Sequence, residues 1–207
     1  MSQLQAAITR AQDKLEAART RASELTASNS FPRVHQSWRH FLVSANGVFS
    51  MLEQGVKNNG SASAWFGRHK NARRTDPLLS YTHHARNADE HGVNSITGEA
   101  KPRIEFVAGG TPQATLVDLV GSGDRLEGTL NTADGGNWIN PENVTELRIH
   151  PHRPSLIPVN DRGVTYNPPR DHLGKPLIDD HPHAVAQHMI AYLEKMIAEA
   201  EKFLPHR

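Results

Sequence analysis

Residues 34–57, VHQSWRHFLVSANGVFSMLEQGVK, contain the pattern that decides the fold class. Apolar side chains recur every three or four residues, so they lie along one side of an α-helix. This wide stripe consists of Trp38, Phe41, Leu42, Ala45, Phe49, Leu52 and Val56. A helix with such a stripe buries it against other helices, so the stretch predicts a mainly α-helical protein.

A second helical pattern lies upstream, over residues 4–25. Its apolar or small residues are spaced alternately four and three residues apart, as in the a and d positions of a heptad repeat. They are Leu4, Ile8, Ala11, Leu15, Ala18, Ala22 and Leu25. Such a seam packs against other helices of the same domain or lengthens a dimer interface. We expect a homodimer, with this seam contributing to it.

Further helices are predicted on both sides of a β-rich segment. Residues 61–74 form a short helix, Asp76 and Pro77 begin the next one as N-cap and first residue, and Gly92 ends it. A last helix covers residues 182–203. Between them are short β-like runs separated by Gly-rich turns, at 103–108, 114–120, 125–130, 145–150, 156–159 and 163–166.

The expected fold is therefore a helical bundle with a small β-rich insertion before the last helix, α+β overall. Residues 1–92 supply the first bundle helices. Residues 93–180 form the β-rich insertion and a Pro-rich loop. Residues 181–207 contain the C-terminal helix that completes the bundle.

Composition limits the class of protein. The chain has 207 residues, of which 37% are hydrophobic, and this fits one domain with an insertion. No run of about 18 apolar residues exists, so we expect no membrane span. The N-terminus has no basic and apolar leader, and the chain has no Cys. These features predict a cytoplasmic protein without disulfides.

Positive charge is concentrated in the first half of the chain. Residues 1–92 carry 12 Lys and Arg against 7 Asp and Glu, whereas residues 93–207 carry 11 against 15. Cations cluster at Arg68, Lys70, Arg73 and Arg74, just after Trp65 and Phe66. We expect the four cations to bind RNA phosphates and the two aromatic residues to anchor the helix in the core. The alternative is a solvated helix face.

The motif Arg86-Asn87-Ala88-Asp89-Glu90-His91 carries the strongest chemical signal. Arg binds phosphate through its planar fork of donors, and His transfers protons near neutral pH. Asn87 and His91 are one helical turn apart, so Asn87 can orient the His91 ring. His84 is a second candidate base. The alternative is a surface Arg beside a His that caps a helix end.

This motif resembles the Arg-polar-x(3)-His signature of HEPN domains. The resemblance implies an all-helical bundle with metal-independent endoribonuclease activity, in which two protomers bring their Arg and His residues to a shared cleft. It implies catalytic roles for Arg86 and His91, with Asn87 as polar support. It also implies RNA as substrate, a toxin or anti-phage role, and an antitoxin or another defence-system protein as partner. The β-rich insertion departs from a minimal HEPN domain.

The remaining residues add no second catalytic signature. The 13 His residues show no recognised zinc spacing, so we expect no metal and no cofactor. Two other functions remain open from the sequence. One is a non-catalytic dimeric interaction or scaffold protein, and the other is a nucleic-acid-binding regulator that uses residues 68–74.

Overall fold

The computed structural model describes residues 2–27, 30–91, 95–122, 125–136, 138–177, 179 and 181–204, with residues 91 and 122 described by their backbone only. The chain divides into two compact units. The helical unit comprises Met1–Gly98 and Pro154–Arg207, and the inserted unit comprises Glu99–Arg153. The insertion is therefore shorter than the predicted 93–180, because residues from Pro154 onward pack with the helices. Within the described residues the protein combines α-helices with antiparallel strands, as the α+β prediction requires.

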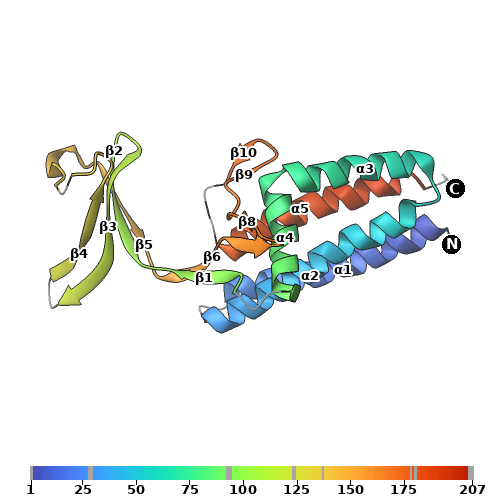
Figure 1. Ribbon diagram of the computed structural model, residues 1–207, viewed down its shortest axis with the longest axis horizontal. Coiled ribbons are helices and arrows are strands. Elements are labelled where there is room, and N and C mark those ends of the chain that lie inside the picture. Colours follow the sequence, from blue (N-terminus) through green and yellow to red (C-terminus); the bar gives the residue numbers. More distant parts are fainter. Residues whose placement is uncertain are drawn as a thin grey trace. The chain divides into compact units, whose positions relative to one another are not determined.

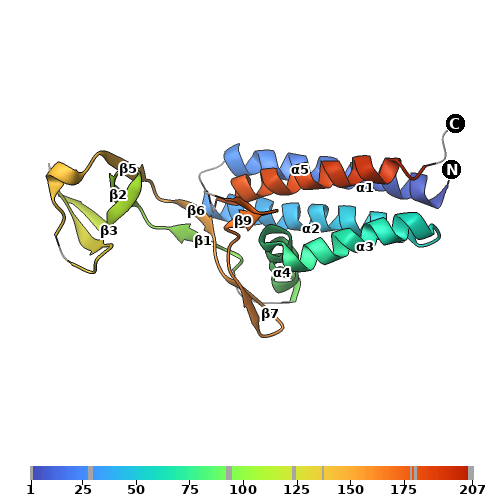
Figure 2. The same ribbon diagram turned by 90° about the horizontal axis from the view of Figure 1, so that it is seen from above.

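The helical unit contains the five α-helices found in the described residues (Figures 1 and 2). They are α1 (Gln3–Ala27), α2 (Phe31–Val56), α3 (Gly60–Thr75), α4 (Pro77–His91) and α5 (Pro182–Glu201). Four of them run along a similar direction, while α4 runs across them (Figure 1). Their apolar faces share one core, which includes the fully buried Trp38, Phe41 and Phe49 of the α2 stripe.

The apolar seam of α1 packs against other helices of the same chain. All seven predicted seam residues are buried, and α1 packs against α2 and α5. The contact with α2 is close, because a Cβ at Gly55 would clash with the Cβ of Ala7. Of the two roles predicted for the seam, packing within the domain is therefore the one that the structure contains. The seam gives no support to a dimer.

The helix boundaries have local chemical causes. Asp76 caps α4 as predicted, since its carboxylate accepts a hydrogen bond from the Leu79 amide at 2.9 Å. Asn59 caps α3, since its side chain accepts a hydrogen bond from the Ala62 amide at 3.0 Å. The predicted end at Gly92 lies outside the described residues.

Short hairpins complete the helical unit, and the two strands of a further pair each contain a boundary between the units. β7 (Val159–Asp161) pairs with β8 (Val164–Tyr166), and β9 (Asp171–His172) pairs with β10 (Lys175–Pro176). Both hairpins turn through two residues with positive φ, Arg162-Gly163 and Leu173-Gly174, which suits the right-handed strand twist. β1 (Thr97–Ala100) pairs with β6 (Arg153–Leu156). The single strand predicted at 156–159 is thus divided between β6 and β7.

The inserted unit is a four-stranded antiparallel sheet with strand order β4-β3-β2-β5. Its strands are β2 (Arg103–Ala108), β3 (Thr111–Ser122), β4 (Arg125–Thr132) and β5 (Glu146–His150). A short 3-10 helix, η1 (Pro141–Asn143), precedes β5. The short β-like runs between Gly-rich turns predicted all four strands, with β2 at the same boundaries.

Candidate functional site

The polar residues of α4 meet the β7–β8 hairpin at Asp161. His84 and Asn87 are three residues apart on α4, so both project from the same side of the helix. The Nδ1 atom of His84 lies 2.7 Å from Oδ2 of Asp161, and the Nδ2 atom of Asn87 donates to the same oxygen at 3.0 Å. A carboxylate, a histidine and an amide from two distant parts of the chain thus form one cluster.

Asp161 is held in its charged form at this position. Its side chain is only 7% exposed. The hydrogen bond from His84 lowers the pKa of Asp161, the one from Asn87 acts in the same direction, and burial opposes both. An ionised carboxylate only accepts hydrogen bonds, so His84 carries a proton on Nδ1. This tautomer leaves Nε2 of the neutral ring as a proton acceptor.

Tyr166 of β8 fixes the plane of the His84 ring. The two rings are stacked, with centroids 3.7 Å apart and planes 10° from parallel. In the described residues Nε2 of His84 has no hydrogen-bond partner, and the side chain is 23% exposed. The ring is therefore oriented by the protein on one nitrogen and one face, while its other nitrogen is free to meet a ligand.

Arg86 joins this cluster through Asn87. Its Nη1 atom donates to Oδ1 of Asn87 at 3.3 Å, and its Nη2 atom pairs with Oε1 of Glu90 at 2.6 Å. The buried Nε atom has no hydrogen-bond partner among the described residues. Asn87 therefore bridges Arg86 and Asp161 through the two ends of its amide. A phosphate that approached Arg86 would compete with Glu90.

The last residue of the predicted motif is located only by its backbone. His91 is the final residue of α4, and its side chain lies outside the described residues. The prediction that Asn87 orients the His91 ring is therefore untested, whereas Asn87 does contact Arg86 and Asp161. Asp161 and Tyr166 were not predicted as site residues, because nothing in the sequence relates them to a helix more than 70 residues away.

His83 lies beside the cluster on α4 and is kept neutral. Burial lowers its pKa to about 4, and the charges of Arg73 and, with a smaller effect, Arg86 act in the same direction. Its Nδ1 atom has no partner among the described residues. His83 also lines a cavity of about 10 Å³ together with Arg73 and Asn46, a volume that holds about one water. Cations of α3 and α4 therefore act on the same imidazole.

The four cations predicted to bind RNA do not form one free surface. Lys70 forms an ion pair with Glu53 of α2. The Arg73 guanidinium lies 5.0 Å from the centre of the Phe49 ring, and burial lowers its pKa. Arg68 and Arg74 are exposed, and neither has an ion-pair partner among the described residues. Lys70 is exposed as well, so Arg68 and Arg74 are the two of the four cations that are exposed and without an ion-pair partner among the described residues.

The other predicted role on α3 is confirmed. Trp65 and Phe66 are each 3% exposed and belong to the core. His69 lies within the basic stretch, between Arg68 and Lys70, and its Nδ1 atom is 2.7 Å from the Tyr192 hydroxyl. Burial lowers the pKa of His69 and raises that of Tyr192 to about 12. His69 therefore serves the contact between α3 and α5 and not a cationic surface.

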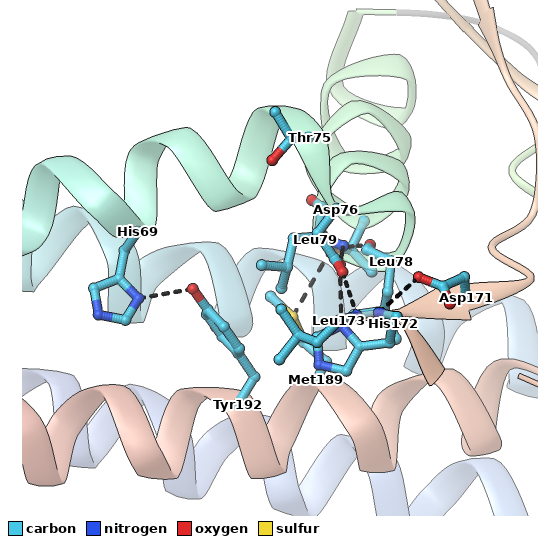
Figure 3. A network of polar contacts seen from close by, with 12 residues as sticks. His69, Thr75, Asp76, Leu78, Leu79, Asp171, His172, Leu173, Met189 and Tyr192 are labelled. Carbon is cyan, nitrogen blue, oxygen red and sulfur yellow. Dashed lines mark hydrogen bonds and ion pairs between the residues drawn. The ribbon is translucent and has the colours of Figure 1, made fainter. Parts of the chain in front are cut away.

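A second polar network lies at the corner between α3 and α4 (Figure 3). Besides capping α4, the Asp76 carboxylate accepts from the Leu173 amide at 2.7 Å and lies 3.0 Å from Nδ1 of His172. These contacts attach the β9–β10 turn to the start of α4. Asp76 is 6% exposed and satisfied by three donors, so its role is structural.

Comparisons with known proteins leave the function to be argued from this site. The chain matches no protein-family model, no curated protein and no solved structure. Among the described residues no group of three or more His, Asp or Glu side chains is arranged to hold a metal ion. None of the described helices combines the length and the apolar character needed to cross a bilayer.

Proposed function

We propose that this chain is a metal-independent endoribonuclease of the HEPN type. The observation that supports this proposal is the unbroken set of contacts from Arg86 through Asn87 and Asp161 to His84. Metal-free cleavage of RNA needs a cation beside the phosphate and an imidazole that moves a proton, and this cluster holds both.

The proposal includes the organisation that the HEPN resemblance implies. Helices α1–α5 would be the bundle, interrupted by the β-rich insertion before α5. The chain would act on RNA in the cytoplasm as a homodimer. Its role would be that of a toxin or an anti-phage effector, with an antitoxin or another defence-system protein as partner.

In the proposed reaction the 2′-oxygen of a ribose attacks the adjacent phosphorus, and the bond from phosphorus to the 5′-oxygen breaks. Nε2 of His84 accepts the proton of the 2′-OH, and His91 donates a proton to the leaving 5′-oxygen. Arg86 stabilises the charge on the phosphoryl oxygens after the phosphate displaces Glu90. The products are a 2′,3′-cyclic phosphate and a 5′-OH end.

The test is incubation of total RNA in EDTA with the wild type and with the variants Arg86→Ala, His84→Ala and His91→Ala. His152→Ala is the matched control, since that side chain is 57% exposed in the inserted unit. We expect cleavage by the wild type and the control, and a loss of about 100-fold or more in each of the other three variants. Equal cleavage by all five proteins, or none in EDTA, would contradict the proposal.

A second candidate function is a non-catalytic interaction or scaffold protein. The observation that favours it is the pairing of the motif within the chain. Arg86 pairs with Glu90, and Asp89 pairs with Arg39 of α2 at 2.6 Å. In this alternative these ion pairs only hold α4 in place. It predicts that the wild type cleaves no RNA and that Arg86→Ala lowers the stability of the fold.

A further inference from the structure

The sheet of the inserted unit has one apolar and one charged face. Cross-strand partners in an antiparallel sheet place their side chains on the same face. Ile149 is opposite Ile104, Ile104 opposite Leu116, and Leu116 opposite Leu130. Phe106 and Leu147 form a further pair on this face. The six side chains span all four strands, and none of them carries a charge.

The opposite face carries the charged residues of the sheet, together with Val107, which lies opposite Glu146 and is buried. It carries Arg103, Glu105 and Arg148, with Glu105 close to Arg103 at 3.3 Å and to His150 at 3.1 Å. Val120 also lies on this side, since it is opposite Glu127 of β4. Antiparallel sheets commonly have one solvated face and one face that packs on a core.

Part of the apolar face is uncovered in the described residues of the inserted unit. Ile149 is 74% exposed and Leu147 is 58% exposed. Val107 and Ala114 are the only buried hydrophobic residues among the described residues 99–153. A hollow of about 390 Å³ opens beside Phe106 and Leu147. A sheet with an apolar face needs a second layer for its stability. Among the described residues of this unit, Ile139, Pro141 and Val144 line the hollow with Phe106 and Leu147 and provide only part of such a layer.

We propose that this face packs against the same face of a second copy of the chain, so that two sheets form a β-sandwich. An uncharged, apolar face selects a partner that is equally apolar, and a second copy provides such a face in a two-fold contact. Four strands about 4.8 Å apart, with about six residues each rising about 3.4 Å, present a face of roughly 19 by 20 Å. Two such faces, with their protruding side chains, bury on the order of 1,000 Å², which is about the lower limit for a specific interface.

The proposal is independent of RNA cleavage and is tested by the oligomeric state of the full chain. Sedimentation velocity over a wide concentration range should show a monomer–dimer equilibrium for the wild type. Ile149→Lys places a charge on the apolar face and should weaken the dimer at least about tenfold. Val120→Lys is the matched control, because Val120 is 65% exposed on the opposite face, and it should leave the dimer unchanged. Circular dichroism should show that both variants are folded.

A second measurement does not depend on the Lys variants. The chain has no Cys, so Ile149→Cys and Val120→Cys each introduce a single thiol. The thiol at position 149 should become protected from a thiol reagent as the protein concentration rises, and the thiol at position 120 should stay reactive. A wild type that stays monomeric, or equal effects at both positions, would overturn the proposal. Protection at position 149 in a monomer would place another part of the same chain on this face, which also overturns it.

Discussion

At the scale of single residues, Asp161 is the position on which the candidate site depends. Its carboxylate is the common acceptor for His84 and Asn87 and holds the proton on Nδ1 of His84. The same arrangement, a buried carboxylate behind a catalytic imidazole, sets the tautomer of the histidine in many hydrolases.

Asp161→Asn should therefore lower RNA cleavage by about 100-fold while the fold is kept. The neutral amide has nearly the same shape, but it no longer selects the Nδ1–H tautomer of His84. Initial rates of cleavage across a range of pH would measure the effect. Asp134→Asn is the control, since Asp134 is an exposed residue of the inserted unit. Equal rates for the wild type and Asp161→Asn would show that His84 is not the base.

His83 predicts how stability depends on pH. Its pKa is about 4 in the folded chain, whereas that of an unfolded His is about 6.5. Between these two pH values His83 is protonated in the unfolded chain and neutral in the folded chain. The contribution of His83 is therefore complete above about pH 6.5 and is lost as the pH falls towards 4. Burial lowers the pKa of His69 too, which acts in the same direction.

The wild type should unfold at a lower urea concentration at about pH 5 than at about pH 7.5. In His83→Gln the difference between the two midpoints should be smaller, since one of the groups that cause it is removed. His152→Gln is the control on an exposed histidine and should behave as the wild type. If His83→Gln keeps the full difference, the imidazole of His83 is not the cause.

At the scale of elements, the contact between α1 and α2 depends on a small residue. Gly55 lies in α2, where Ala7 of α1 leaves no room for a Cβ, and it is buried. Gly67 lies in α3, and a Cβ placed there would have no neighbour within 4 Å. The same substitution thus meets a crowded interface in one helix and open space in the other.

Gly67→Ala should stabilise the fold by about 0.5–1 kcal/mol, because Ala loses less backbone entropy than Gly in a helix. Gly55→Ala should destabilise it by about 1–3 kcal/mol, because α1 and α2 must separate to admit the methyl group. Urea unfolding of both variants and the wild type would measure the two effects. Two changes of the same sign would contradict the packing described for α1 and α2.

At the scale of the whole molecule, the two units differ in net charge. Residues 99–153 carry five Lys and Arg against eight Asp and Glu, so the inserted unit is acidic. The rest of the chain is basic. RNA binding is therefore expected from the helical unit and not from the inserted sheet.

RNA affinity should fall with salt. The logarithm of the association constant should fall against the logarithm of the salt concentration with a slope of about 0.7 per phosphate contact on a single strand. Arg68→Gln and Arg74→Gln should each reduce that slope by about this amount, because both side chains are exposed and without ion-pair partners among the described residues. Arg73→Gln should change it less, since Arg73 is partly buried on Phe49. Arg19→Gln is the control, because Arg19 pairs with Glu16 and Glu194. Binding isotherms at several salt concentrations would measure the slopes, and a slope unchanged in Arg68→Gln and Arg74→Gln would show that this stretch does not contact RNA.

Local signals in the sequence predicted the helices and the longer strands, whereas β1 and the β9–β10 hairpin, which lies in the predicted Pro-rich loop, were not predicted. The apolar stripe of residues 34–57 predicted α2, a short β-like run before a Gly-rich turn predicted β2 at its observed boundaries, and Asp76 predicted the start of α4. Each of these patterns depends on neighbours within a few residues, and backbone geometry converts them directly into a helix, a strand or a cap.

Which elements contact one another depends on tertiary packing. The seam of α1 suits a second chain as well as it suits α2 and α5, since apolar side chains specify burial and not the identity of the partner. The bond between Asn87 and Asp161 joins residues 74 positions apart, and no local pattern encodes that distance. Packing of the β7–β8 hairpin on α4 places the carboxylate, because long-range contacts are set by the fit of whole elements and not by the residues on either side.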